Sequence, residues 1–295
     1  MSTPPEADPV RIEVIADGLG FTEGPACLPD GRIALTSISH GCVYIVDPAG
    51  GPMDRIHTGG GPNGLAVGSN GEIYVAQNGG IFGASGAAEA GVQLIRDGRV
   101  DYLAQGMDAP NDLVIGPDGR LWVTDTRAQL DFSNPDPNKP GWVWAVETST
   151  GEKELMLDSG PVFINGLGFS SDAALLMVTA TSGAQLWSYR LGPAGQPDKA
   201  SAAVLCIFDG GWPDGMAVCA DGACWVALTG GHRLDLVDQH GHTVDTVALP
   251  DGALPTNVCL NTERVDELFV TAAFHQALLR IGRPKTSSRV VNHSL

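Results

Sequence analysis

The stretch NDLVIGPDGRLWVTD (Asn111–Asp125) carries the pattern that decides the fold. It opens with a carboxamide, continues with an apolar run, turns at Pro-Asp-Gly and ends in a second run rich in β-forming residues. Asp-Gly and Asn-Gly pairs supply the positive φ that tight β-turns require. Apolar and polar residues alternate on either side of the turn, as they do in β-strands. The stretch therefore predicts a hairpin of two antiparallel strands.

Five more copies of this pattern occur along the chain. Two precede it and three follow it, namely EGPACLPDGRIALTS (Glu23–Ser37), NGLAVGSNGEIYVAQ (Asn63–Gln77), NGLGFSSDAALLMVTAT (Asn165–Thr181), DGMAVCADGACWVAL (Asp214–Leu228) and NVCLNTERVDELFVTAA (Asn257–Ala273). The first residues of successive copies are 40, 48, 54, 49 and 43 positions apart. A repeat of this length is typical of one propeller blade.

A second strand pair is predicted after each hairpin, for example from Cys42, Val143 and Leu234. The fold class is therefore all-β: a six-bladed β-propeller with four antiparallel strands per blade. We expect the N-terminal strand Val10–Ala16 to complete the last blade, close the ring and cover its edge. We also expect residues 1–295 to form a single domain, with residues 1–9 flexible. The alternative is a β-sandwich in which the turns recur by coincidence.

The charge balance limits the partners of the protein. Seventeen Lys and Arg against 34 Asp and Glu give a net charge of −17. Binding to nucleic acid or to an anionic membrane depends on clustered Lys and Arg, so we expect neither and instead predict a small-molecule partner. Hydrophobic residues make up 43% and charged residues 17% of the chain, which indicates a folded globule. Nothing in the sequence indicates the oligomeric state.

The chain has no run of roughly 18–20 apolar residues of the kind that crosses a membrane. Its first residues lack the basic and apolar regions of a secretory signal. We therefore expect a cytoplasmic protein. The six cysteines form no CxxC pair, and we expect reduced, mostly buried thiols; their even number leaves disulfides as the alternative.

The first residue of each repeat begins the strand nearest the propeller axis, so these six residues are expected to converge on a central channel. They are Glu23, Asn63, Asn111, Asn165, Asp214 and Asn257. Each side chain offers oxygen, and hard divalent cations bind carboxylate and carboxamide oxygens. We therefore predict one divalent cation, with Ca²⁺ favoured and Mg²⁺, Mn²⁺ or Zn²⁺ as alternatives. The competing interpretation, turn capping by Asn and Asp, explains Glu23 poorly.

Four motifs resemble those of the SMP-30/gluconolactonase family, which includes regucalcin-type lactonases. They are FTEGP (Phe21–Pro25), APNDL (Ala109–Leu113), INGLGFSSD (Ile164–Asp172) and WPDGMAVCADGACWVA (Trp212–Ala227). The likeness extends over essentially the whole chain, in the family's motif order. It implies a six-bladed propeller with a divalent metal, usually Ca²⁺, in the central channel. It also implies that the metal ligands are Glu23, Asn111, Asn165 and Asp214.

Such a site suits a metal-dependent hydrolase that opens a lactone ring. The metal polarises the carbonyl while Asp214 activates water, and attack by Asp214 itself is the alternative. We assign catalytic roles to Asp214 and Glu23. Hydrolysis of another ester or of a phosphotriester at the same site is a second hypothesis, and a non-catalytic binding module is a third. The chain contains no GxSxG, GK[ST] or HExxH motif that would favour different chemistry.

Substrate-binding residues are predicted around the channel mouth. We assign this role to Asn63, Asn111, Asn257, Phe21, Phe163, Trp212 and His40. The resemblance adds that regucalcin-type sugar lactonases carry an arginine two residues before the channel asparagine, where this chain has Ala109; a less polar lactone or ester is therefore favoured. The long segments 77–93 and 126–142 are expected to form a lid lined by Phe82, Leu130 and Phe132, with solvated loops as the alternative.

Overall fold

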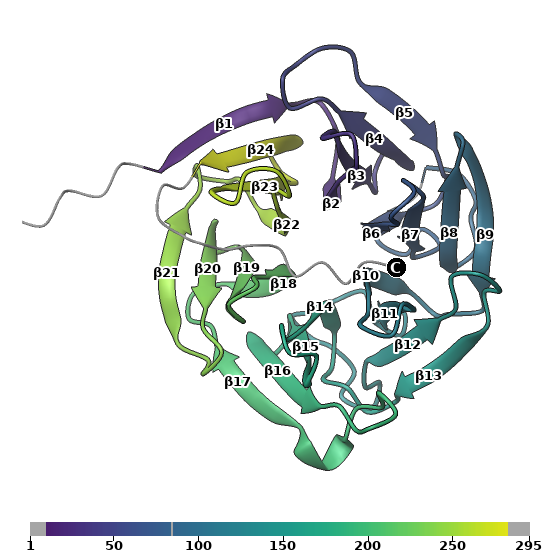
Figure 1. Ribbon diagram of the computed structural model, residues 1–295, viewed down its shortest axis with the longest axis vertical. Helices are drawn as coiled ribbons and strands as arrows, with labels where there is room; N and C mark the ends of the chain where they lie inside the picture. The colour runs from purple at the N-terminus through teal and green to yellow at the C-terminus, as the bar shows by residue number, and fades with distance from the viewer. Residues whose placement is uncertain (1–9, 84, 283–295) are drawn as a thin grey trace, which may run out of the picture.

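The structure is a ring of six β-sheets around a central axis (Figure 1). It is a computed structural model that describes residues 10–83 and 85–282, so the predicted flexibility of residues 1–9 falls outside the described residues. Each sheet contains four antiparallel strands. Within the described ranges the helical content is a 3-10 turn at Lys199–Ser201, and no helix there could span a membrane. The predicted six-bladed β-propeller is confirmed.

The first half of the ring contains blades 1 to 3, each named here from its innermost strand outward. Blade 1 contains β2 (Thr22–Cys27), β3 (Ile33–Ser37), β4 (Cys42–Val46) and β5 (Asp54–His57). Blade 2 contains β6 (Pro62–Val67), β7 (Ile73–Gln77), β8 (Gly91–Arg96) and β9 (Arg99–Gln105). Blade 3 contains β10 (Pro110–Ile115), β11 (Leu121–Asp125), β12 (Trp142–Val146) and β13 (Lys153–Leu157).

The second half contains blades 4 to 6. Blade 4 contains β14 (Ile164–Phe169), β15 (Leu175–Ala180), β16 (Gln185–Arg190) and β17 (Ala203–Ile207). Blade 5 contains β18 (Trp212–Val218), β19 (Cys224–Thr229), β20 (Arg233–Val237) and β21 (Thr243–Ala248). Blade 6 contains β22 (Pro255–Leu260), β23 (Glu267–Ala272), β24 (Ala277–Gly282) and, as its outer strand, β1 (Arg11–Ala16).

The N-terminal strand β1 closes the ring, as predicted. It pairs antiparallel with β24, from Arg11 opposite Gly282 to Ala16 opposite Leu278. An ion pair of 2.6 Å between Arg280 Nη2 and Glu13 Oε2 joins the two strands. Because β1 covers the edge of β24, residues from the two ends of the described chain complete one blade.

The hydrophobic core of the described residues consists of six clusters, each between two neighbouring blades. Between blades 3 and 4, for example, the rings of Trp122 and Phe169 meet edge to face with centroids 5.1 Å apart. The second strand of a blade lies between two such clusters, so β3, β7 and β11 are buried along their whole length. Their polar side chains therefore face protein and need internal partners.

Buried threonines of the second strands connect three blades to the next blade at the axis. The bonds run from Thr36 Oγ1 to Asn63 O (2.6 Å), from Thr124 Oγ1 to Asn165 O (2.6 Å) and from Thr179 Oγ1 to Asp214 O (2.7 Å). Each accepting carbonyl belongs to a residue predicted to line the channel. These bonds therefore fix the backbone of three candidate site residues against the neighbouring blade.

Each inner strand departs from regular pairing where it reaches the axis. The register of β10 against β11 shifts between Pro110 and Leu113, and the other five inner strands shift at a corresponding place. A β-bulge breaks the alternation of side chains between the two faces of a strand. Two successive residues, such as Asn111 and Asp112, are therefore both directed into the channel region.

Candidate functional site

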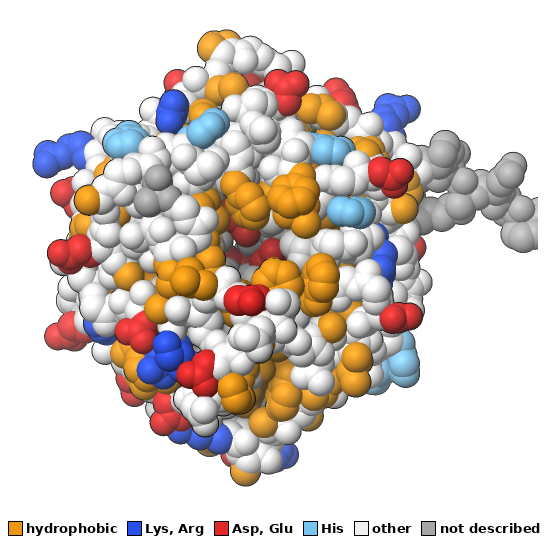
Figure 2. Space-filling view, turned by 180° about the vertical axis from the view of Figure 1, so that it is seen from behind, with side chains coloured by type: hydrophobic (Ala, Val, Ile, Leu, Met, Phe, Trp, Pro, Cys, Tyr) orange, Lys and Arg blue, Asp and Glu red, His pale blue; other side chains and the backbone are white. Residues whose placement is uncertain are grey.

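Five of the predicted channel residues occupy equivalent places on the inner strands of blades 1 to 5. They are Glu23, Asn63, Asn111, Asn165 and Asp214, and none is more than 8% exposed. Seen along the axis, the face shown in Figure 2 has a central hollow with acidic side chains at its bottom. The ring thus gathers residues from five separate repeats around one channel. We call this row of equivalent places the polar row.

The sixth place in this row is taken by Thr256, and Asn257 lies one residue further along β22. Asn257 N donates to Thr271 Oγ1 at 3.0 Å, just as Asp112 N donates to Thr124 Oγ1 at 3.0 Å. Asn257 is therefore the counterpart of Asp112, and our placement of Asn257 in register with Glu23 is wrong. The cause is that Asn257-Val258 in the sixth repeat resembles the Asn-Gly pair with which other repeats begin.

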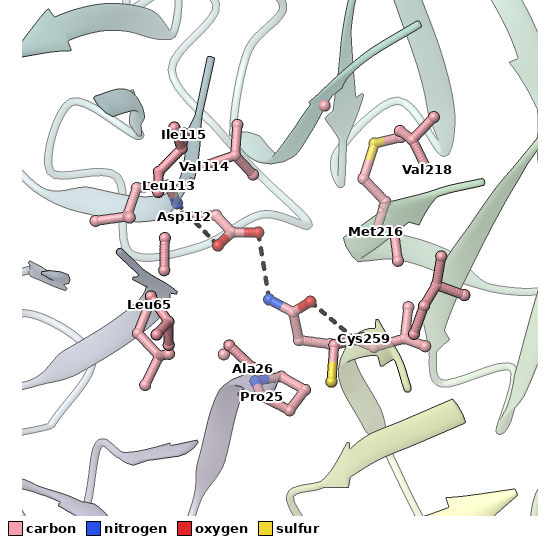
Figure 3. Close-up of a pocket in the computed structure, with 18 of the residues that line it drawn as sticks. Pro25, Ala26, Leu65, Asp112, Leu113, Val114, Ile115, Met216, Val218 and Cys259 are labelled. Atoms are coloured by element: carbon pink, nitrogen blue, oxygen red, sulfur yellow. Dashed lines mark hydrogen bonds between the residues drawn. The ribbon is translucent and has the colours of Figure 1, made fainter. Parts of the chain in front are cut away.

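The residue that directly follows each member of the polar row belongs to a second layer beneath it, which we call the floor. Four of these residues are glycines and two carry side chains: Gly24, Gly64, Gly166, Gly215, Asp112 and Asn257. A Cβ atom on Gly64 would collide with Asp112, and one on Gly215 would collide with Asn257. The glycines therefore leave room for two side chains to cross the axis, where Asn257 Nδ2 donates to Asp112 Oδ2 at 3.2 Å (Figure 3).

Asp112 is a functional candidate that the sequence analysis missed. It directly follows Asn111, and a regular strand would place these two side chains on opposite faces. The bulge in β10 removes that restriction. The signal available in the sequence was that this repeat carries a carboxylate where Gly24, Gly64 and Gly215 stand in other repeats.

Three buried carboxyl groups share the channel. Burial raises the pKa of Glu23 well above its ordinary value, and the nearby Asp214 and Asp112 raise it further. Burial also raises the pKa of Asp214 well above its ordinary value, with Asp112 as the second cause. The pKa of Asp112 is raised to about 6, again by burial. In the described part of the chain no lysine or arginine is among the groups that shift these three pKa values.

Hydrogen bonds orient the surrounding amides. Asn165 Nδ2 donates to Thr181 Oγ1 at 3.2 Å, and Thr181 Oγ1 donates to Pro213 O at 2.9 Å. Asn165 also lies close enough to Asp214, and Asn257 close enough to Glu23, to lower the pKa of the neighbouring carboxyl group. By contrast, Asn63 Oδ1 is buried and has no hydrogen-bond partner within the described ranges. A buried oxygen in this state costs free energy unless a ligand or ion satisfies it.

These residues fit a divalent cation. Glu23 and Asp214 offer two negative charges, and Asn111 and Asn165 offer neutral oxygens at the same level of the ring. In residues 10–83 and 85–282 no three His, Cys, Asp or Glu side chains group as a metal site, so a cation here would need the carboxamides as well. A bound cation would also offset the repulsion among the three carboxylates.

A separate cavity of about 270 Å³ lies beyond the Asp112–Asn257 pair (Figure 3). Its walls are residues further along the inner strands, among them Leu113, Leu167 and Met216. Asp112 and Asn257 line this cavity, whereas Glu23 and Asp214 do not, so the pair lies between the cavity and the other two carboxyl groups. Apart from Asp112, Asn257 and Thr262, the side chains that line the cavity are apolar or carry a thiol, and Glu23 and Asp214 are not among them.

The mouth of the channel contains three of the predicted substrate-binding residues. Phe21, Phe163 and Trp212 each lie two positions before a residue of the polar row. His40 has a different environment: its Nδ1 hydrogen-bonds Tyr44 Oη at 2.9 Å, on the third strand of blade 1. His40 is therefore engaged within its own blade.

The two long segments reach this mouth. Phe82 of segment 77–93 and Phe132 of segment 126–142 both contact Phe163, with ring centroids 6.2 Å and 5.9 Å apart. Leu130, also of segment 126–142, is 66% exposed, and its place in the lining of a lid stays a prediction. Phe132 follows two residues later, at a tight turn in which Asp131 Oδ1 accepts hydrogen bonds from both N and Oγ of Ser133.

Fold and site together define a class of protein: six-bladed propellers with an oxygen-rich central channel. A family model described as the SMP-30/gluconolactonase/LRE-like region matches residues 21–274. The match spans most of the ring, including every residue of the polar row. This chain belongs to the SMP-30/gluconolactonase family.

Individual relatives agree with this assignment. A gluconolactonase from Zymomonas mobilis is 25% identical over 298 aligned positions, which cover 91% of this chain and 81% of the relative. A 6-deoxy-6-sulfogluconolactonase from Pseudomonas putida is 29% identical over 175 positions, covering 55% of this chain and 53% of the relative. The solved structure of regucalcin from Agrobacterium tumefaciens, described as a calcium-binding protein, has a TM-score of 0.74 at 17% identity and covers 95% of this chain and 96% of that chain. The latter likeness supports the fold.

Proposed function

We propose that this chain is a divalent-metal-dependent hydrolase that opens a lactone ring. The observation that carries the proposal is the group of three buried carboxyl groups, Glu23, Asp112 and Asp214, whose pKa values are all raised. Burying like charges together is costly unless a cation compensates them. The names of the two curated relatives, a gluconolactonase and a sulfogluconolactonase, support a lactone as the substrate.

The proposed ligands of the cation are Glu23, Asn111, Asn165 and Asp214. Ca²⁺ is favoured because it accepts mixed carboxylate and carboxamide oxygens in flexible numbers, and the regucalcin neighbour is described as calcium-binding. Mg²⁺, Mn²⁺ and Zn²⁺ are the alternatives. When bound, the cation would polarise the lactone carbonyl and stabilise negative charge on its oxygen.

Asp214 is the proposed general base. Its carboxylate accepts a proton from water as the water oxygen bonds to the carbonyl carbon. The ring C–O bond then breaks, the proton passes from Asp214 to the departing ring oxygen, and the product is a hydroxy acid. Asn165 lies beside Asp214 and stabilises its carboxylate form. Asn257 stabilises the carboxylate form of Glu23 in the same way.

The alternative role of Asp214 is that of a nucleophile: its carboxylate bonds to the acyl carbon, the ring C–O bond breaks, and the resulting mixed anhydride is then hydrolysed by water. The two roles differ in where the oxygen of water first appears. In a single turnover in ¹⁸O-labelled water, hydrolysis of the anhydride at the Asp214 carbonyl places the label in the Asp214 side chain, whereas the general-base role leaves Asp214 unlabelled and places the label in the product.

The proposal is tested by proton release from γ- and δ-lactones. Enzyme treated with a chelator is compared with enzyme resupplied with Ca²⁺, Mg²⁺, Mn²⁺ or Zn²⁺. We expect turnover to be lost on chelation and restored by at least one cation. Undiminished turnover by metal-free enzyme would exclude the metal, and stoichiometric cation binding without turnover of any lactone would favour another ester, a phosphotriester or a binding module.

Asp214→Asn separates catalysis from cation binding. The amide keeps an oxygen for the cation but cannot accept the proton, so we expect kcat to fall by about 10²- to 10⁴-fold while the fold and measurable cation binding remain. Asp235→Asn is a matched control, because Asp235 is buried in blade 5 beside Arg233 and outside the channel. Equal losses in both variants would indicate a structural effect.

A further inference from the structure

The row of residues above the polar row is apolar around the whole ring. It consists of the residues two positions before the polar row: Phe21, Gly61, Ala109, Phe163, Trp212 and Leu254. A shared backbone hydrogen bond shows that these positions are equivalent. In five blades the carbonyl oxygen accepts a hydrogen bond from the backbone N–H of the residue that follows the second strand. In blade 4, for example, Thr181 N donates to Phe163 O at 3.1 Å. The channel thus changes from oxygen-rich to apolar within two residues.

Four aromatic rings gather on one side of this mouth. Phe163 and Trp212 come from the starts of the inner strands of blades 4 and 5, and Phe82 and Phe132 come from the long segments of blades 2 and 3. The Phe82–Phe163, Phe132–Phe163 and Phe132–Trp212 centroids are 6.2, 5.9 and 5.2 Å apart, in tilted or edge-to-face contacts. Figure 2 shows hydrophobic side chains bordering the hollow that contains the acidic groups.

The positions of three of these rings are fixed by their surroundings. Phe163 has a φ of 54°, a left-handed conformation that is unfavourable for a bulky residue. The Trp212 ring lies where a side chain on Gly230 would stand. The segment that carries Phe132 is tied across its base by Gln129, whose Nε2 donates to Lys139 O at 3.1 Å and whose Oε1 accepts from Asp136 N at 2.7 Å.

The cluster is nevertheless incompletely covered by protein. Trp212 is 43% exposed, and Phe82 and Phe132 are only partly buried. Rings that served only to hold the loops together would be expected to bury their faces, because exposed aromatic surface is unfavourable in water. An apolar surface that adjoins a polar reaction site is instead typical of a ligand pocket.

We propose that Phe82, Phe132, Phe163 and Trp212 form a subsite for an apolar substituent on the lactone, so that the preferred substrate carries an alkyl chain beside the reacting ring. This inference rests on the proposed lactone hydrolysis and names its substrate class. The polar row holds the ring oxygens, and the aromatic cluster takes the chain out of water. Ring opening adds one water across the acyl C–O bond and yields a hydroxy acid with the same chain.

The length of the chain provides the main test. Unsubstituted δ-valerolactone is compared with δ-lactones whose alkyl chains grow by single methylenes, and with the polyhydroxylated glucono-δ-lactone. Burial of each methylene is expected to raise kcat/KM by about threefold to fourfold until the subsite is filled. Glucono-δ-lactone is expected to be the poorer substrate of the wild-type protein.

Two variants connect this dependence to the rings. Trp212→Ala and Phe132→Ala should each reduce the preference for the longest chain over δ-valerolactone by about tenfold. Phe274→Ala is the matched control: Phe274 is 66% exposed in the loop after β23, and the ring contacts described above for the cluster do not include it. A purely structural role of Trp212 would lower turnover of all lactones equally and leave the dependence on chain length unchanged.

The outcomes separate the two proposals. Equal kcat/KM along the series in wild-type protein, or a preference for glucono-δ-lactone, overturns the subsite and leaves lactone hydrolysis standing. Absence of turnover with every lactone, despite bound Ca²⁺, overturns both. The wild-type series needs no variant, so the test holds even if one substitution prevents folding.

Discussion

Asn257 and Asp112 meet across the propeller axis through a hydrogen bond of 3.2 Å from Asn257 Nδ2 to Asp112 Oδ2. They belong to blades 6 and 3, which face each other in a six-membered ring (Figure 1). The same asparagine lies beside Glu23, a proposed cation ligand, and partly offsets the rise in the pKa of its carboxyl group. One amide therefore links a carboxylate of the polar row to a carboxylate of the floor.

Replacing Asp112 with Asn is expected to weaken cation binding by about tenfold, because a negative charge a few ångströms away from a cation contributes on the order of 1–2 kcal/mol in a protein interior. None of the four proposed ligands is changed. Isothermal titration calorimetry with Ca²⁺ measures the difference. Asp118→Asn is the control, since Asp118 lies in an exposed turn of blade 3 and pairs with Arg120. An unchanged affinity would contradict the proposal that Asp112 acts on the site through its charge.

The same variant should change the pH dependence of stability in metal-free protein. Burial raises the pKa of Asp112 in the folded state to about 6, above its ordinary value of 3.8, so the folded state holds this proton more tightly. The contribution of Asp112 to the free energy of unfolding is therefore greatest below about pH 4 and is lost as the pH rises from about 4 to about 6. We expect the stability of Asp112→Asn to decrease less than that of the wild-type protein over this pH range. Tm values measured between pH 4 and 7 would show the difference. A parallel decline in both proteins would contradict this cause.

Cation binding is expected to strengthen as pH rises. The pKa values of Glu23 and Asp214 are raised, so the metal-free site retains protons that a cation must displace. Titration calorimetry in two buffers of different ionisation enthalpy counts the released protons. Asp214→Asn removes one of these groups and should reduce the count. An affinity and a proton count that do not vary with pH would show that both carboxyl groups are already ionised.

Much of the fold could be predicted because it depends on local rules that repeat six times. Asp-Gly and Asn-Gly turns, as at Asp118–Gly119, specify hairpins, and the recurring spacing specifies blades. Ring closure followed from a single extra strand before the first repeat. These features depend on neighbouring residues in the chain, which a sequence displays directly.

The parts of the site that escaped prediction depend on the bulges of the inner strands. The side chains of Asn111 and Asp112 both serve the channel only because β10 changes register between them and β11. In β22 the shift falls between Pro255 and Asn257, which moves Thr256 into the polar row. Likewise, the contact of Phe132 with Trp212 joins segments 80 positions apart in the chain and depends on how a long loop folds over the mouth.

Deleting residues 1–16 should destabilise the ring far more than deleting residues 1–9. The longer deletion removes β1, which covers β24, and with it the packing of Ile12 and Ile15 on two core clusters. Because this buried apolar surface is lost, the free energy of unfolding is expected to fall by roughly 3–5 kcal/mol, which corresponds to a decrease in Tm of about 10 °C. The deletion of residues 1–9 keeps the strand and serves as the control. Equal Tm values for the two deletions would contradict ring closure by β1.

Cys27 is expected to be the most readily alkylated of the six cysteines near neutral pH. It is partly exposed at the end of β2 and lines the cavity beyond the Asp112–Asn257 pair. A hydrogen bond from Cys259 is the main cause that lowers the pKa of Cys27 to about 7, whereas burial raises the pKa of Cys42, Cys206 and Cys224. Because the thiolate is the reactive form, the rate of carbamidomethylation should rise with pH through a midpoint near 7.

Cys259→Ala tests the cause of this reactivity. The variant removes the donor that stabilises the Cys27 thiolate, so the midpoint should move to higher pH. Mass spectrometry of the peptide that contains Cys27, after timed exposure to iodoacetamide at several pH values, gives both midpoints. Cys206→Ala is the control, because Cys206 lies in β17 of blade 4, away from the boundary between blades 6 and 1. If Cys27 reacts no faster than the buried thiols, or if its midpoint is the same in Cys259→Ala, the proposed hydrogen bond does not set its reactivity.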